Sequence, residues 1–207
     1  MRYGVIGDTR TVALVCANGS IDWACLPDFD SPAMFAKLLD TEAGSFSIRP
    51  ATAYASRQYY ETGTNVLITE FSTESGKIRL RDFMPYVPQR KVATAEIHRI
   101  LECADGEVDV LLQFSPRFDY GKNIPCFTTS EFGVRAAHGE ISVVLSTLVP
   151  CTMTQNSAEA AFTVKAGDEL SFIVDWDMKE IHPPLSYQTY KRIWETRKSW
   201  RNWIGRD

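Results

Sequence analysis

Residues 12–23 read VALVCANGSIDW, and this stretch decides the expected fold class. Residues 12–16 form a short apolar run suited to a buried strand, and residues 20–23 resume the alternation of a strand. Asn18-Gly19 stands between them as a tight-turn signal, because both residue types tolerate the positive φ angles of such turns. The stretch therefore predicts a β-hairpin.

The segment after this hairpin is rich in proline and acidic residues. Pro27 resists regular strand pairing because it has no N–H group to donate. Ser31-Pro32 then has the form of a helix N-cap followed by proline at the first helical position. We expect a short helix to follow, running through Phe35, Leu38 and Leu39.

The rest of the chain repeats the pattern of short strand-like runs between turn residues. Residues 85–90 and 116–125 have the composition of loops. Turn signals stand at Gly63-Thr64-Asn65, Glu74-Ser75-Gly76, Asp105-Gly106, His138-Gly139 and Ala166-Gly167-Asp168. Strands are expected at residues 45–48, 54–60, 66–71, 77–83, 95–103, 108–114, 133–137, 141–148, 161–165 and 170–176. About a dozen strands with almost no helix predict a sandwich or a barrel.

The end of the chain is the exception. Residues 187–204 contain no proline, and apolar and aromatic residues recur there at helical spacing. A helix over these residues places Trp194, Trp200 and Trp203 near one face. That face either packs back onto the sandwich or meets a further part of the polypeptide.

Composition limits the partners and the compartment. A net charge of −4 over 207 residues does not suggest a nucleic-acid partner, which needs a basic surface. Neither a signal peptide nor a membrane-length apolar run is recognisable, so we expect a cytoplasmic protein without a membrane partner. The five cysteines are odd in number and lack a CxxC pair, which favours free thiols in a reducing compartment.

The remaining motifs give no sign of a cofactor. His98, His138 and His182 are scattered without the spacing of metal ligands, so no metal site is expected. Residues 4–7 lack a full phosphate-binding fingerprint, and no serine or cysteine has an identifiable base partner. We therefore expect no cofactor.

The hairpin belongs to a series of short sequence motifs that follow one another along the chain. They are IGDTRT at 6–11, ALV at 13–15, NGSIDW at 18–23, LPDFDSPAMF at 26–35, GTNVL at 63–67, RDFMP at 81–85 and PRFDYG at 116–121. This series resembles the opening of the two-domain bacterial and archaeal enzymes of glycoside hydrolase family 15, which include glucoamylases, glucodextranases and trehalases. The resemblance covers nearly the whole chain.

The resemblance implies a large antiparallel β-sandwich, a supersandwich, as one domain over residues 1–184. Residues 185–207 are then the start of a helical linker to an (α/α)6 barrel, which in this family carries both catalytic glutamates and inverts the anomeric configuration. The chain itself is expected to be the non-catalytic N-terminal domain of a trehalase-like or glucoamylase-like α-glucoside hydrolase. Its expected partner is the catalytic barrel of the same polypeptide, which binds the α-glucoside substrate.

A catalytic pair of carboxyl groups within this chain is not expected. Inverting glycosidases hold two carboxyl groups roughly 6.5–9.5 Å apart to admit a water molecule. Several aspartates stand near aromatic residues, but aspartate is also a common turn residue. These aspartates are Asp22, Asp28, Asp30, Asp119, Asp175 and Asp177.

Two loops, residues 26–35 and 117–121, are expected to face the barrel and to border its substrate entrance. Their aromatic and charged residues are also types that hold sugars, so an independent carbohydrate-binding module is the alternative. Asp28 departs from the family, which frequently has a basic residue between the proline and the phenylalanine. The candidate residues are Arg10, Asp22, Trp23, Asp28, Phe29, Asp30, Arg117, Asp119 and Tyr120.

A purely structural interpretation of the same residues is also open. In that case Trp23 and Phe29 are core anchors, and Asp22 is a buried hydrogen-bond acceptor for turn amides. Arg117 with Asp119 is then a local ion pair that shapes a loop.

Overall fold

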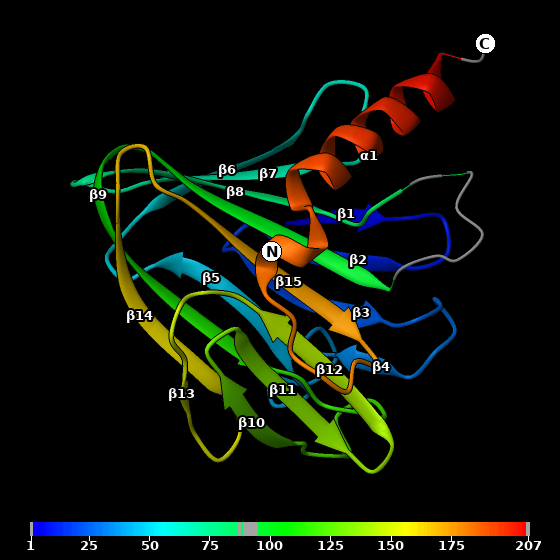
Figure 1. The fold of residues 1–207 in the computed structure, drawn as a ribbon. Helices are drawn as coiled ribbons and strands as arrows, with labels where there is room; N and C mark the ends of the chain where they lie inside the picture. Colours follow the sequence, from blue (N-terminus) through cyan, green and yellow to red (C-terminus); the bar gives the residue numbers. More distant parts are fainter. Residues whose placement is uncertain (1, 87, 89–94, 206–207) are drawn as a thin grey trace.

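The computed structural model describes residues 2–86, 88 and 95–205 of the chain. Antiparallel strands dominate this part, and a helix lies close to the C-terminus (Figure 1). The all-β sandwich with a C-terminal helix expected from the sequence is therefore confirmed. The elements are β1 (Tyr3–Gly7), β2 (Val12–Cys16), β3 (Ser20–Cys25), β4 (Ala33–Phe35), β5 (Ser45–Pro50), β6 (Ala55–Tyr60), β7 (Leu67–Ser72), β8 (Gly76–Phe83), β9 (Glu96–Ser115), β10 (Cys126–Ser130), β11 (Gly133–His138), β12 (Ile141–Ser146), β13 (Thr152–Met153), β14 (Ala158–Lys165), β15 (Glu169–Trp176), the 3-10 helix η1 (Pro184–Tyr187) and α1 (Thr189–Ile204).

Strand β9 joins the two layers of the sandwich. Its first half pairs with β8 and β15, and its second half pairs with β5 and β14. The first layer contains β1, β2, β3, β5, the second half of β9 and β14, with β4 and β13 at its margins. The second layer contains β6, β7, β8, the first half of β9, β15, β12, β11 and β10. Because β9 belongs to both layers, they form one hydrogen-bonded system.

Two of the turns expected from the sequence lie where β9 bends. Ala166-Gly167-Asp168 forms the predicted turn between β14 and β15, and Asp168 N donates to Lys165 O at 2.8 Å. Asp105-Gly106 instead lies inside the continuous strand β9 rather than between two strands. Gly167 N donates to Cys103 O at 3.0 Å and Ala166 N donates to Gly106 O at 2.9 Å, so the two segments bend together (Figure 1). Gly106 and Gly167 have φ angles of 71° and 95°, a conformation that favours glycine.

The predicted β2–β3 hairpin is confirmed, and its turn is held against β5. Gly19 has a φ angle of 82°, and its N–H donates to Cys16 O at 2.9 Å. Ile48 N of β5 donates to Gly19 O at 3.2 Å. A Cβ atom at Gly19 would lie 2.2 Å from Ile48 O, so the close approach of β5 requires glycine as well.

The core between the layers contains a buried ion pair. Arg99 of β9 and Asp82 of β8 are fully buried, and Nε of Arg99 lies 2.8 Å from Oδ1 of Asp82. Nη1 of Arg99 donates to Phe46 O at 2.8 Å, and Nη2 donates to Gly19 O at 2.7 Å. Burial raises the pKa of the Asp82 carboxyl, whereas the positive charge of Arg99 opposes this rise. The pair therefore connects the second layer to β5 and to the hairpin turn of the first.

The prediction of a helix after Ser31-Pro32 is wrong. Residues Ala33–Phe35 form β4, which pairs with β3, and all three side chains are buried. The chain then makes a turn in which Leu39 N and Asp40 N both donate to Ala36 O. Strand pairing and burial outweigh the local helix signal here, because tertiary contacts are stronger than intrinsic propensity.

Strands β1, β10 and β13 are not predicted by the sequence pattern. Strands β10 and β13 are exposed along most of their length, so their sequences lack the alternation on which the prediction depends. The predicted loop at residues 116–125 is confirmed, whereas most of the predicted loop at residues 85–90 lies outside the described residues.

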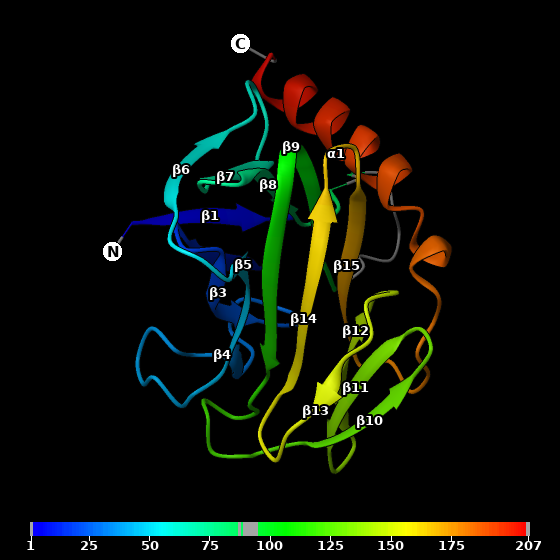
Figure 2. The same cartoon turned by 90° about the vertical axis from the view of Figure 1, so that its left-hand side faces the viewer.

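Helix α1 confirms the helix predicted at the end of the chain. It lies along the outside of the second layer (Figure 2). Ile193 is buried and joins an apolar cluster with Val66, Phe83 and Ile100. The helix therefore packs on the sandwich through its aliphatic side.

The bend gives a stability prediction with a matched control. A Cβ atom at Gly106 would lie 2.1 Å from Ser75 O, whereas nothing lies within 4 Å of a Cβ atom at Gly167. We expect Gly106→Ala to lower the free energy of unfolding by about 3 kcal/mol or more, and Gly167→Ala by about 1 kcal/mol. Urea unfolding of the two variants measures the difference. Equal losses would contradict the assignment of Gly106 to the tightest point of the bend.

Candidate functional site

The loops that follow β1 and β3 meet at one end of the sandwich. Arg10 donates from Nε and Nη2 to Asp28 Oδ1, at 3.1 and 2.6 Å. Phe29 N donates to Arg10 O at 3.1 Å, which joins the two loops through the backbone as well. The Phe29 side chain is 72% exposed, so its interpretation as a core anchor is wrong. Asp30 beside it is also exposed.

The second predicted loop, residues 117–121, is hydrogen-bonded to the first. Arg117 N donates to Met34 O at 2.9 Å, and Tyr120 N donates to Ala33 O at 3.2 Å. The structure thus brings the two predicted loops side by side. We use the name loop surface for the exposed residues Phe29, Asp30 and Tyr120 together with the neighbouring Arg10–Asp28 pair.

Asp22 and Trp23 do not belong to this surface. Asp22 is buried and accepts hydrogen bonds from Ser20 Oγ at 2.5 Å and Tyr3 Oη at 3.0 Å. It is therefore a buried acceptor, but for hydroxyl groups and not for turn amides. Trp23 is half-buried and packs against a cluster of small side chains, namely Cys25, Ala33, Ala36 and Ala43.

The ion pair predicted between Arg117 and Asp119 is wrong. Asp119 instead pairs with Lys122, with 3.1 Å between Oδ2 and Nζ. Arg117 is buried, and its Nη1 donates to the carbonyl oxygens of Pro116 and Asn156 at 2.9 Å each. Burial lowers the pKa of the Arg117 guanidinium, because the charged form loses contact with water.

Among the candidate aspartates, Asp175 has the pKa that the fold changes most. Burial and the nearby negative charge of Glu96 raise its pKa to about 7. It lies at the end of β15, beside Tyr187 of η1, and burial and Asp175 raise the pKa of this tyrosine. The pair of Asp175 and Glu96 is covered, so it does not have the access to substrate that a glycosidase acid and base require.

The carboxyl pair belongs to a polar cluster that the sequence did not predict. His98 is fully buried, and its ring nitrogens lie 2.8 Å from Glu96 Oε2 and 3.1 Å from Thr189 Oγ1. Arg192 Nη2 lies 3.7 Å from Glu96 Oε1. These contacts attach the first turn of α1 to the start of β9. The available signal was the spacing of Glu96 and His98, which places both side chains on one face of a strand.

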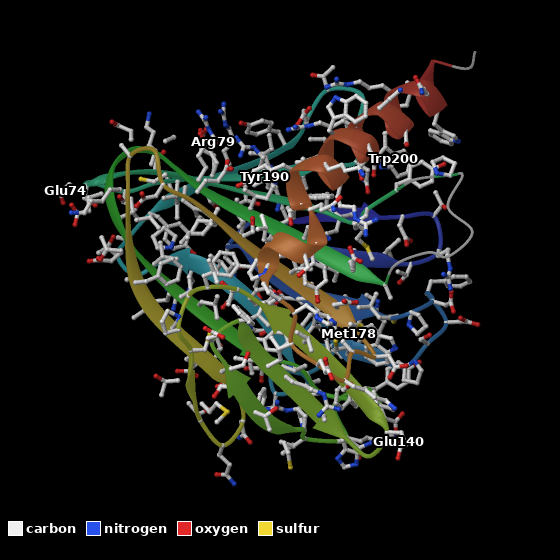
Figure 3. All side chains as sticks on the ribbon, in the orientation of Figure 1. Glu74, Arg79, Glu140, Met178, Tyr190 and Trp200 are labelled. Carbon is white, nitrogen blue, oxygen red and sulfur yellow. The ribbon has the colours of Figure 1, made fainter. Side chains whose placement is uncertain are left out.

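The tryptophans of α1 divide between covered and exposed positions. Trp194 and Trp203 are 60% and 56% exposed, whereas the ring of Trp200 lies 4.6 Å from that of Tyr86. Figure 3 shows Tyr190 and Trp200 near the two ends of the helix. The helix thus packs on the sandwich and still presents two large aromatic side chains to solvent.

Other kinds of site were sought among residues 2–86, 88 and 95–205. No group of His, Cys, Asp or Glu side chains in these ranges is arranged to hold a metal ion. No helix within them has the length and apolar character needed to cross a membrane. All five cysteines lie in these ranges, and none is in a disulfide bond.

These observations define a class, an antiparallel sandwich domain with an attached C-terminal helix. Residues 1–172 match the protein-family model described as "Trehalase-like, N-terminal". The chain belongs to this family, which confirms the resemblance seen in the sequence.

Several relatives of this chain are named trehalases. The chain is 36% identical over 98% of its length to a trehalase of Thermoplasma volcanium, and covers 33% of that protein. It is 32% identical over 93% of its length to a trehalase of Thermoplasma acidophilum, of which it covers 34%. With a trehalase of Mycolicibacterium smegmatis the identity is 27%, over 98% of this chain and 34% of the relative. The chain thus spans about a third of the length of the curated relatives it matches.

The raised pKa of Asp175 gives a pH-dependent prediction. In the unfolded chain the carboxyl loses its proton near its ordinary value of 3.8, and in the folded chain near 7. Between these pH values the folded chain holds the extra proton, so stability falls as the pH rises. We expect Asp175→Asn to raise the free energy of unfolding by about 1–3 kcal/mol at pH 8 and to have little effect at pH 4.

Urea unfolding at the two pH values measures this difference. The control is Asp119→Asn in the exposed pair with Lys122, which should change the free energy of unfolding by less than about 1 kcal/mol. A loss of stability at pH 8 in Asp175→Asn would show that the buried carboxylate is stabilised by its surroundings.

Proposed function

We propose that this chain is the non-catalytic N-terminal domain of a longer α-glucoside hydrolase of the trehalase type. The observation that carries the proposal is the length of the chain, which covers only about a third of the length of relatives that are named trehalases. The state of its aspartates supports the same conclusion. Asp28 and Asp119 are held by exposed cations, and Asp175 is covered.

The proposed partner is a catalytic barrel of the same polypeptide, which supplies two glutamates and binds the α-glucoside. In this proposal residues 1–184 form the sandwich domain, and residues 185–207 begin the linker. The free cysteines fit a reducing, cytoplasmic compartment. Trehalose is the substrate that the names of the relatives favour over a maltooligosaccharide.

Two surfaces of the sandwich are suited to contact with the barrel. Phe29 and Tyr120 on the loop surface are 72% and 46% exposed, and Trp194 and Trp203 on the helix are exposed to a similar degree. Large exposed aromatic side chains grouped on a surface are typical of sites that a partner covers. The loop surface also carries the Arg10–Asp28 pair, whose charges are suited to the edge of an interface. We assign to it the support of the barrel and the shaping of the substrate entrance.

The alternative, an independent carbohydrate-binding module, has less support. The first layer bears a polar cavity of about 520 Å³, large enough for a sugar. Its lining among the described residues contains no aromatic side chain on which a sugar ring could stack. Quenching of tryptophan fluorescence by saccharides would distinguish a binding module from an interface domain.

The first test compares glucose release from trehalose and from maltooligosaccharides by the complete gene product and by the 207-residue chain. We expect activity from the complete product alone, with trehalose as the better substrate. Glucose release by the 207-residue chain would overturn the proposal, because it would place a catalytic pair inside the sandwich.

The second test concerns the loop surface. We expect Phe29→Ser to lower the trehalase activity of the complete gene product about tenfold, because it removes an apolar contact from the interface. The free energy of unfolding of the 207-residue chain should not change, since this side chain is 72% exposed. The control is Tyr59→Ser on strand β6, a side chain with 36% exposure that lies outside both proposed interfaces. Equal effects of the two variants on activity would contradict the role of the loop surface.

A further inference from the structure

The outer face of the first layer contains two adjoining polar cavities. The larger, about 520 Å³, lies over β5, β9 and β14 and is lined in part by Arg49 and Glu159. The smaller, about 330 Å³, is lined in part by Glu42 and Arg117. Lys37 and Gln113 line both cavities, so the two form one groove. We call it the first-layer groove.

The cations of this groove differ from most arginines of the described residues. Arg117, Lys37 and Arg49 form no ion pair with any carboxylate of the described residues. This is notable in a chain with a net charge of −4. By contrast, ion pairs are formed by Arg10, Arg57, Arg79, Arg81, Arg99, Arg192, Arg197 and Arg201.

Arg117 is the most constrained of the three. The residue is 5% exposed, and Nη1 donates both of its side-chain hydrogen bonds, to neutral carbonyl oxygens. Nε and Nη2 have no hydrogen-bond partner among the described residues. Glu42 attracts the guanidinium only at a distance, without forming an ion pair. Neither Nε nor Nη2 is among the fully buried polar atoms without a partner, so both remain open to solvent and to a group of opposite charge.

Hydroxyl groups beside Arg117 are free to add to a ligand site. Ser45 of β5 and Ser115 of β9 are direct partners in the strand register and line the smaller cavity. Neither hydroxyl has a hydrogen-bond partner among the described residues. The cavity therefore combines a guanidinium edge, the ammonium group of Lys37 and two hydroxyl donors.

We propose that the first-layer groove binds a small oxyanion, held by Arg117 and Lys37 and bordered by Ser45 and Ser115. The planar guanidinium offers two parallel N–H donors, a geometry that matches two oxygen atoms of a phosphate or a carboxylate. Lys37 adds a second positive charge, and the serine hydroxyl groups donate to the remaining oxygens. A neutral sugar fits less well, because no aromatic ring lines the groove in the described part of the chain.

Isothermal titration calorimetry of the 207-residue chain with inorganic phosphate, and separately with acetate, tests the site at constant ionic strength. We expect saturable binding of at least one of the two anions. Tighter binding of phosphate identifies a free phosphate or phosphate ester as the source of the oxyanion. Tighter binding of acetate identifies a carboxylate side chain from another protein segment.

Four variants assign the binding to the groove. Lys37→Gln should weaken binding about tenfold by removing a positive charge. Arg117→Lys should weaken binding to a similar extent by removing the bidentate guanidinium donor. Glu42→Gln should tighten binding by removing a competing negative charge from the cavity. Lys77→Gln, which makes the same charge change at an exposed position of strand β8, should leave binding unchanged.

Two results would overturn the proposal. One is the absence of saturable binding of both anions to the folded chain, as verified by circular dichroism. The other is an equal loss of affinity in Lys77→Gln and Lys37→Gln, which would show that only the overall charge of the chain matters. Neither result depends on the presence of a catalytic barrel, so the proposed function is tested separately.

Discussion

The buried guanidinium of Arg99 is the constraint on which the arrangement of the two layers depends. Removing a charged group from water costs several kcal/mol, so the fold must supply a counter-ion and acceptors in fixed positions. Asp82 supplies the counter-ion, and the carbonyl groups of Phe46 and Gly19 supply acceptors from the opposite layer. The hairpin turn, strand β5 and strand β8 are therefore held in one mutual register by a single side chain.

The bend shared by β9 and β14–β15 also connects the two layers, in this case through the backbone. Two strands that cross together from one layer to the other keep their hydrogen bonds through the bend, with glycine at the strained positions. A sandwich built in this way has a continuous core and leaves its outer faces for other uses. The outer face of the second layer is covered by α1, and the outer face of the first layer holds the first-layer groove.

Buried polar atoms without a hydrogen-bond partner gather near the C-terminal helix. Four buried polar atoms without a hydrogen-bond partner are found in the described residues, and all lie between η1 and the end of α1: Tyr187 Oη, Arg192 Nη1, Glu195 Oε2 and Trp200 Nε1. Native interiors leave few such atoms, so their concentration here marks a region that further contacts would complete. This agrees with the proposal that the helix leads into another domain.

The sequence by itself determined the elements that depend on local chemistry. Turn geometry and side-chain alternation depend on neighbouring residues, so they can be predicted from the sequence. The features predicted in this way are the Asn18-Gly19 hairpin, most of the strands, helix α1 and the motifs of the family. Only the tertiary structure decided the rest. The β4 strand replaced the expected helix, the turn expected at Asp105-Gly106 became a bend inside β9, and Arg117 lacks its expected partner, since long-range pairing and burial set these outcomes.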